Sequence, residues 1–171
     1  EEVQEDINLP LLGNIPYLEM LEESNLSTDS ILDKLDVSSN NANADKQKNL
    51  NNKRLFYKEA FRSFYTSIRF LNTDKKIKSL IIASSLPMEG RTSINILTAK
   101  TLSEMGEKIL LIDADMRQPK VHRKLGLNNL RGLSNLLSDD KLTSDNVIQE
   151  IPGNENFKVI TSGIKPPDST K

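Results

Sequence analysis

The stretch Ser84–Ser93 constrains this chain most, because it joins a short apolar run to an amphipathic one through a loop with a glycine near its end. Phosphate-binding loops with the pattern G-x-x-x-x-G-K-[ST] occupy the same place, between a buried strand and a helix. Ser85 stands at the first glycine position of this pattern, and Gly90 stands at the second. Arg91 takes the place of the lysine, and Thr92 that of the hydroxyl residue. The loop therefore predicts a nucleoside polyphosphate with a magnesium ion as its ligand.

The chemistry of such a loop explains which residues we expect to bind the nucleotide. A turn before a helix exposes consecutive backbone N–H groups, and the helix N-terminus adds partial positive charge. Arg91 keeps the charge of the usual lysine, but its guanidinium is wider and planar. The expected nucleotide-binding residues are Ser85, Met88, Glu89, Gly90, Arg91, Thr92 and Ser93. The alternative is a plain junction between strand and helix, with Thr92 or Ser93 near the N-cap.

Two carboxylates follow the next apolar run, in the segment Ile109–Arg117. Asp113 and Asp115 come directly after a predicted buried parallel strand, and ligands of open α/β sheets lie at the carboxyl ends of strands. Carboxylates repel phosphates, so a metal ion between them resolves the conflict. We expect Asp113 to hold magnesium, together with the Thr92 hydroxyl. Asp115 either takes a proton from an attacking hydroxyl or shares the metal. The alternative is that both aspartates cap the helix near Pro119.

Apolar periodicity predicts an alternation of strands and helices. A stripe of apolar residues at helical spacing indicates a helix over 54–71; it consists of Tyr57, Phe61, Phe64, Ile68 and Leu71. The other predicted helices cover 92–105, 119–125 and 133–137, and the predicted strands cover 78–83, 108–114 and 157–161. This order favours an α/β fold, a parallel β-sheet flanked by helices. Gly106 is the expected C-terminal stop of the helix over 92–105.

Charge and composition divide the chain into three predicted parts. Residues 1–37 form an acidic leader with a short docking segment over 8–17, and residues 1–50 carry a net charge of −8. Residues 38–52 are rich in asparagine and predict a flexible linker. Residues 53–171 form the predicted nucleotide-binding domain, and residues 51–171 carry a net charge of +7. The chain contains no cysteine, which excludes disulfides and thiolate metal sites. No apolar run approaches the ~18 residues of a membrane-spanning helix.

Together with several further motifs, the loop and the acidic segment resemble one known family, the bacterial tyrosine kinases that regulate capsular and exopolysaccharide synthesis. The motifs follow one another along this chain in the same order as in that family. Ile109–Arg117 resembles the family's second Walker-type motif and is the most specific match. The other matching segments are 11–16, 59–62, 68–70, 132–137 and 162–167. The resemblance implies a P-loop fold related to the partition ATPases. It also implies that this domain is incomplete, with its C-terminal part missing.

The resemblance implies an ATP- and Mg²⁺-dependent protein-tyrosine kinase that autophosphorylates and controls polysaccharide chain length or export. By position, Asp113 holds the metal, and Asp115 is the base. Arg91 stands where the family has lysine, and we count it with Asp115 as catalytic. Gly90, Thr92 and Ser93 contact phosphates or the metal.

The resemblance also implies partners and a location. Subunits would associate into a ring through Glu59, Arg62 and Arg69. A membrane-bound polysaccharide co-polymerase half would lie upstream or on a separate chain, at the cytoplasmic face of the bacterial inner membrane. We expect no nucleic acid among the partners.

Two other functions stay open. Because Arg91 replaces the lysine, the chain is either an active kinase or a nucleotide-binding regulator of polysaccharide assembly that has lost catalysis. The third reading is a partition-type ATPase acting on DNA, which the basic domain permits.

One basic stretch stands outside these motifs. His122 is the only histidine, lies in Lys120–Lys124, and is expected on the surface. The cations of this region either neutralise a phosphate or phosphotyrosine or form a solvated helix face. They are Arg117, Lys120, Arg123 and Lys124.

Overall fold

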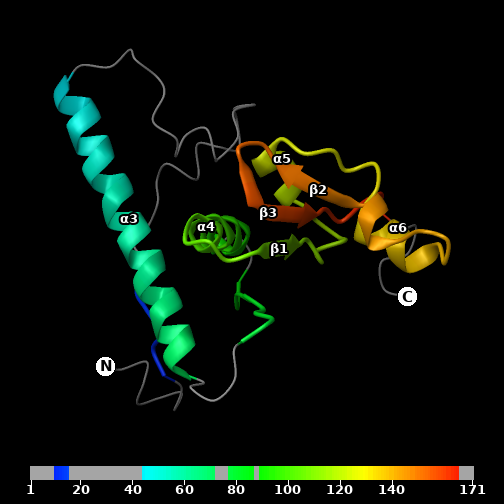
Figure 1. The fold of residues 1–171 in the computed structure, drawn as a ribbon, viewed down its shortest axis with the longest axis horizontal. Helices are drawn as coiled ribbons and strands as arrows, with labels where there is room; N and C mark the ends of the chain where they lie inside the picture. Colours follow the sequence, from blue (N-terminus) through cyan, green and yellow to red (C-terminus); the bar gives the residue numbers. More distant parts are fainter. Residues whose placement is uncertain (1–9, 16–43, 72–76, 87–88, 166–171) are drawn as a thin grey trace. The chain divides into compact units, whose positions relative to one another are not determined.

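The computed structural model describes residues 10–15, 44–71, 77–86 and 89–165, which divide into two compact units (Figure 1). Described residues up to Ile82 form the first unit, and those from Ala83 onward form the second. The first unit contains α3 (Ala44–Leu71). The second contains α4 (Arg91–Glu104), β1 (Ile109–Ile112), α5 (Val121–Leu125), α6 (Leu133–Ser138), the 3₁₀ turn η2 (Ser144–Asn146), β2 (Ile148–Ile151) and β3 (Asn154–Ile160).

Burial of side chains on α3 confirms most of the predicted apolar stripe. Phe61 and Ile68 are buried and Phe64 is half-buried, whereas Leu71 is exposed. The segment 10–15 runs along this helix, since a Cβ placed on Gly13 would contact the Phe64 side chain at 3.5 Å (Figure 1). The docking role predicted for residues 8–17 stays a prediction, because only residues 10–15 of the leader are among the described residues. Among the described helices, α3 included, none is both long and apolar enough to cross a bilayer.

The linker predicted over residues 38–52 needs correction, because α3 already begins at Ala44. No proline or glycine interrupts residues 44–52, and alanine, lysine, glutamine and leucine favour a helix. Asparagine content alone therefore does not stop this helix. Residues 38–43, and the leader apart from residues 10–15, lie outside the described residues.

The sheet is mixed, whereas the sequence predicts a parallel one. Its strand order is β1-β3-β2, with β1 parallel to β3 and β2 antiparallel to β3. Strand β2 was not predicted. It is antiparallel because only Pro152 and Gly153 separate it from β3, and so short a connection forms a hairpin. Gly153 has a φ of 75°, as such a turn requires.

The core of the second unit is formed by apolar side chains of α4, α5, β2 and β3. Phe157 and Val159 point from β3 into it, and Ile151 joins them from β2. Helix α4 contributes Ile96 and Ala99. The sequence predicts a different face for this helix, formed by Ile94, Leu97, Thr98, Thr101, Leu102 and Met105. The buried face of α4 is therefore rotated about the helix axis relative to the predicted face. Leu97, Thr98 and Thr101 are buried as expected, but Met105 is exposed.

The predicted strand over 78–83 is wrong, since residues 77–86 form no strand in the structure. Ile81 is 92% exposed, and Leu80 is also exposed. A strand requires a backbone partner as well as apolar side chains, and the apolar run shows only the second. Strand β1 is accordingly an edge of the described sheet, and its Leu110 and Ile112 are exposed rather than buried as predicted.

The C-terminus of α4 confirms the predicted stop at Gly106. This glycine has a φ of 89°, and its N–H donates to the Ser103 carbonyl at 3.0 Å. The Glu107 N–H donates to the Leu102 carbonyl at 3.1 Å, which completes a Schellman motif. The motif turns the chain from α4 toward β1. The strand then delivers Asp113 to the edge where the candidate site lies.

Candidate functional site

The N-terminus of α4 provides uncapped backbone donors next to open space. Gly90 precedes the helix in the left-handed conformation, with a φ of 79°, and no side chain caps the helix. Its carbonyl accepts the Ile94 N–H at 3.0 Å. A Cβ on Gly90 would meet nothing within 4 Å. Thr92 is half-buried, and Ser93 is buried. The N–H groups of the first turn are thus suited to an anion.

The Glu89 carboxylate accepts hydrogen bonds from residues of its own loop. Its Oε2 accepts the Leu86 N–H at 3.1 Å and the Ser85 hydroxyl at 3.4 Å. The Ser84 hydroxyl donates to the Leu86 carbonyl at 3.1 Å. A carboxylate therefore satisfies donors that a phosphate would otherwise attract. Met88, which the sequence placed at the nucleotide, lies outside the described residues.

Asp113 is a buried carboxylate directly after β1, with a side chain that is only 6% exposed. Its Oδ1 accepts the Asp115 N–H, and its Oδ2 accepts the Val121 N–H, both at 3.2 Å. Its own N–H donates to the Ile160 carbonyl at 2.9 Å, which ties it to β3. Burial raises the pKa of Asp113 more than the two N–H donors lower it. A cation at this carboxylate would offset the cost of its burial.

Asp115 joins the two predicted motifs. Its Oδ2 lies 2.8 Å from Nη2 of Arg91, the first residue of α4. The two side chains are 34% and 42% exposed, so the ion pair is open to solvent. Its Oδ1 accepts the N–H groups of Arg117 and Gln118 at 3.2 and 2.9 Å. The end of the loop and the end of β1 thus meet at one edge of the sheet.

The alternative given to the two aspartates, helix capping, also occurs here. Asp113 accepts the first N–H of α5, and Asp115 accepts N–H groups of the turn before it. Capping does not exclude metal binding, because each carboxylate offers about four lone-pair sites. Among the described residues no group of three or more acidic or histidine side chains could hold a metal. One or two carboxylates are what a magnesium ion on a nucleotide needs, since phosphates and waters complete its shell.

Two motifs that supported the family resemblance form one tight junction after β3. A Cβ on Gly132 would collide with the Thr161 carbonyl and would lie 2.8 Å from the Gly163 Cα. The Leu133 and Ser134 N–H groups donate to the Thr161 and Ser162 carbonyls, both at 2.8 Å. No structural role was predicted for this junction from the sequence. A glycine in each of two distant segments was the available signal, since close backbone approach requires it.

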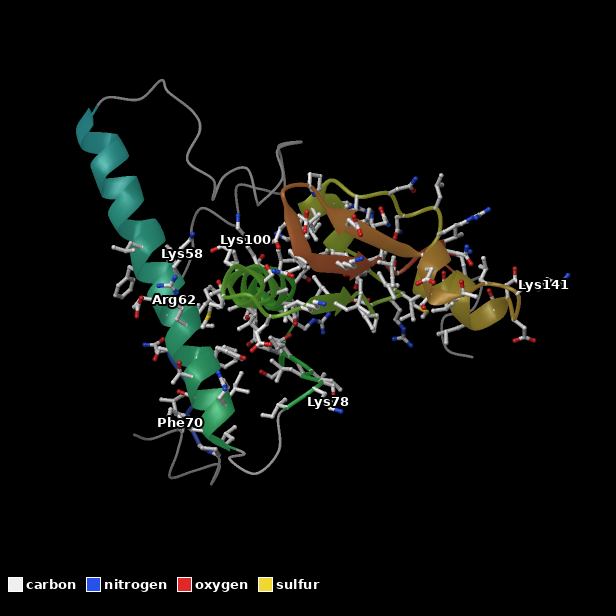
Figure 2. All side chains as sticks on the ribbon, viewed as in Figure 1. Lys58, Arg62, Phe70, Lys78, Lys100 and Lys141 are labelled. Atoms are coloured by element: carbon white, nitrogen blue, oxygen red, sulfur yellow. The ribbon has the colours of Figure 1, made fainter. Side chains whose placement is uncertain are left out.

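The residues expected to join subunits interact within their own helix. Arg62 lies 3.8 Å from Glu59 on exposed α3, and the Arg69 guanidinium lies 5.8 Å from the Tyr65 ring centroid. Figure 2 shows Lys58 and Arg62 projecting from the same stretch of α3. The three side chains thus share one helix, and their role between subunits stays a prediction.

His122 is half-buried rather than exposed as the sequence predicted. Its Nδ1 is buried and has no hydrogen-bond partner among the described residues. Burial and the nearby Arg123 lower the pKa of His122, against an opposing influence of Asp113. Packing of the short helix α5 against the rest of the second unit accounts for the burial of His122. The basic residues around His122 in the sequence do not indicate this packing.

Comparison with known proteins identifies the relatives of this chain. It is 36% identical over 110 residues to the tyrosine-protein kinase YwqD of Bacillus subtilis. It is 36% identical over 113 residues to the putative tyrosine-protein kinase CapB of Staphylococcus aureus. These alignments cover 64% and 66% of this chain but only 46% and 49% of the relatives, so the chain spans about half of their length. No family model matches the sequence.

Solved structures agree with these relatives. The kinase domain of the Escherichia coli tyrosine kinase ETK matches 97% of this chain, with a TM-score of 0.68 and 27% identity, over 60% of its own length. The BceF tyrosine kinase domain matches the same share, with a TM-score of 0.70, 27% identity and 62% of its length covered. The resemblance deduced from the motifs is confirmed: the homologues and structural neighbours of this chain are bacterial tyrosine kinases.

Proposed function

We propose that the second unit is the nucleotide-binding part of a Mg²⁺-ATP-dependent protein-tyrosine kinase with a P-loop fold. The observation that carries this proposal is the 2.8 Å contact between Arg91 and Asp115, because it brings the loop and the acidic strand end together. The bacterial tyrosine kinases among the relatives support it. The mixed sheet beneath α4 supports the same assignment, since solved kinase domains share this fold.

The residues present fit a magnesium nucleotide. The first-turn N–H groups of α4, that of Ser93 included, would hold phosphates, since no side chain caps this end and Gly90 leaves space. Thr92 and Asp113 would hold the magnesium ion. When bound, the nucleotide supplies a γ-phosphoryl group to an attacking hydroxyl. Asp115 would accept the proton of that hydroxyl, and Arg91 would stabilise charge on the phosphoryl oxygens.

The ion pair also favours a second candidate, a nucleotide-binding regulator without catalysis. Asp115 already accepts hydrogen bonds on both oxygens, from Arg91 and from two backbone N–H groups. As long as Arg91 holds Oδ2, this oxygen is less available as a base, and the Arg91 guanidinium is engaged by a carboxylate instead of a phosphate. The kinase requires the pair to separate when the nucleotide binds, whereas the regulator does not.

At the level of the whole protein, we propose autophosphorylation on tyrosine between neighbouring subunits. The relatives include a putative tyrosine-protein kinase in the cps region of Klebsiella pneumoniae, which supports a role in capsular or exopolysaccharide chain length and export. A membrane-bound co-polymerase half, on the same or a separate chain, would place this part at the cytoplasmic face of the inner membrane. Ring-like association would use Glu59, Arg62 and Arg69 on α3.

The test measures ATP binding by calorimetry and then phosphotransfer to a tyrosine-rich peptide, with and without Mg²⁺. The kinase predicts Mg²⁺-dependent binding followed by phosphotyrosine. Tight binding without transfer would remove the kinase and leave the regulator. Arg91→Lys is the informative variant, because it frees Asp115 from a forked partner and restores the compact cation. We expect it to raise phosphotransfer, and a lower rate would show that the chain is adapted to arginine.

A further inference from the structure

A pocket of about 470 Å³ opens beside the turn that follows Asp115, and nothing in the proposed kinase site uses it. Four of its lining side chains are cations: Arg117, Lys120, Arg123 and Lys165. No acidic residue from the described part of the chain lines it. The pocket therefore concentrates positive charge in a concave place, which favours an anionic ligand.

Hydrogen bonds fix the wall of this pocket. The Asn129 Nδ2 donates to the Gly163 carbonyl at 2.9 Å, and the Gly163 N–H returns a bond to Asn129 Oδ1 at 3.0 Å. The Ser134 hydroxyl donates to the Ile164 carbonyl at 2.7 Å. Lys165 follows directly from this anchored backbone. The backbone of this wall is thus held in place before a ligand arrives, whereas the four cationic side chains are exposed and can adjust to it.

Among the described residues, none of the four cations forms an ion pair, in contrast to the paired Arg91 and Lys158 of the same unit. Lys158 lies 2.8 Å from Glu150, and Arg91 lies 2.8 Å from Asp115. Like charges that line one pocket repel one another, and a bound anion relieves this repulsion. The arrangement is therefore more suited to a dianion than to a single carboxylate.

We propose that this pocket binds a phosphomonoester group. Arginine forks match the oxygens of a phosphate, and lysines add point charges that need no fixed geometry. Pro119 and Ile164 also line the pocket and give it an apolar side. Its volume falls within the roughly 300–1,000 Å³ of small-molecule sites. The ligand is either free phosphate or a phosphate carried on a ring, as in a phosphorylated tyrosine side chain.

The inference goes beyond the proposed function and does not depend on it. The nucleotide would lie on the N-terminus of α4 and on Asp113, whereas the pocket is lined from the turn before α5, from α5 and from the segment after β3. Asp115 lies between the two, since its Oδ1 holds the N–H groups of Arg117 and Gln118. An anion in the pocket would thus be a neighbour of the catalytic carboxylate.

The test titrates the nucleotide-free chain with inorganic phosphate and, in a parallel arm, with phenyl phosphate at constant pH. His122 also lines the pocket and is the only histidine, so its ring resonances in NMR report binding at this place. We expect a saturable shift with both probes. Tighter binding of phenyl phosphate identifies a ring-bound phosphate as the ligand, and equal binding identifies free phosphate.

Lys165→Glu and Lys141→Glu form a matched pair, since both are exposed lysines of the second unit with the same change in charge. Figure 2 shows Lys141 at the far end of the second unit, beyond α6. Lys165→Glu should weaken phosphate binding about tenfold or more, since it removes a charge-assisted contact. Lys141→Glu should change it by less than about twofold, because salt screens distant charges.

Three results would overturn the proposal. The first is a His122 resonance that does not shift on addition of either probe. The second is an equal loss of affinity in the two lysine variants, which would indicate unspecific attraction. The third is complete displacement of the phosphate by Mg²⁺-ATP, which would place the anion in the nucleotide site. A chain that binds phosphate but not ATP would contradict the proposed function alone.

Discussion

Two parallel strands, β1 and β3, end side by side at one edge of the sheet, and the chain uses these ends in opposite ways. After β1 come Asp113 and Asp115, beside the uncapped start of α4 and the open space at Gly90. After β3 comes Gly163, which packs so closely on Gly132 that a Cβ would not fit. We call the tightly packed end after β3, at Gly132 and Gly163, the closed end, and the end after β1, at Gly90, Asp113 and Asp115, the open end. The closed end makes this edge of the sheet rigid, and the open end leaves N–H donors and carboxylates for a ligand.

Gly132→Ala should break the closed end and have the largest effect on stability. Its Cβ would collide with backbone atoms, which cannot move as a flexible side chain can. We expect the free energy of unfolding to fall by about 3 kcal/mol or more, measured by urea unfolding. A loss below about 1 kcal/mol would show that the junction yields easily.

Gly90→Ala is the matched change at the open end. No atom lies within 4 Å of its Cβ, so only the left-handed backbone, at a φ of 79°, is strained. We expect a loss of about 1 kcal/mol in the same urea experiment. Equal losses in the two alanine variants would contradict the distinction between a closed and an open strand end.

Glu89→Gln tests whether the negative charge of the loop opposes nucleotide binding at the open end, and it should strengthen ATP binding. The glutamine can still accept the Leu86 N–H, but it removes a negative charge from the loop that would hold phosphates. We expect ATP affinity to rise by about tenfold in calorimetry at low salt. Weaker binding would show that the Glu89 carboxylate shapes the loop or helps to hold the metal.

Arg91→Ala should have a smaller effect on stability. The pair with Asp115 is well exposed to solvent, and exposed ion pairs contribute at most about 1 kcal/mol. Urea unfolding of the nucleotide-free chain measures this contribution. A loss of several kcal/mol would mean that the pair is part of the core structure rather than a contact that a nucleotide can open.

The pH dependence of stability should show a small contribution from Asp113 in metal-free buffer. Because burial raises its folded-state pKa above 3.8, the folded chain holds this proton more tightly than the unfolded chain does. Stability is therefore lost as the pH rises from the unfolded pKa through the raised folded pKa. Asp113→Asn should lack this loss, in urea unfolding across acidic pH. An identical pH profile for the two chains would contradict the effect.

The sequence predicted the helix and the strand that flank the open end, because their signals are local. Asp113 and Asp115 follow a β-branched and leucine-rich strand, and Gly90 precedes a helix whose stop at Gly106 was also foreseen. Arg91, predicted as a loop residue, is the first residue of α4, and its pairing with Asp115 joins two segments 24 residues apart. Spacing alone does not reveal such a pair.

The sequence failed where hydrogen-bond partners decide the structure. The apolar run over 78–83 predicted a strand but could not show that no neighbouring strand pairs with it. Strand β2 contains the polar residues Gln149 and Glu150, so its composition did not indicate a strand. It forms because the Pro152–Gly153 turn allows it to pair with β3. The pocket beside α5 likewise depends on Lys165, which lies 42 residues from Arg123 in sequence.

The central claim is that the loop before α4 and the acids after β1 form one Mg²⁺-nucleotide site, and ATP calorimetry with and without Mg²⁺ tests it most directly. We predict that Mg²⁺ tightens ATP binding, and that Asp113→Asn weakens Mg²⁺-ATP binding about tenfold or more while leaving metal-free binding little changed. Asp140→Asn, an exposed acid of the same unit, is the control and should behave as the unaltered chain does. Undiminished Mg²⁺-ATP affinity in Asp113→Asn would contradict the account.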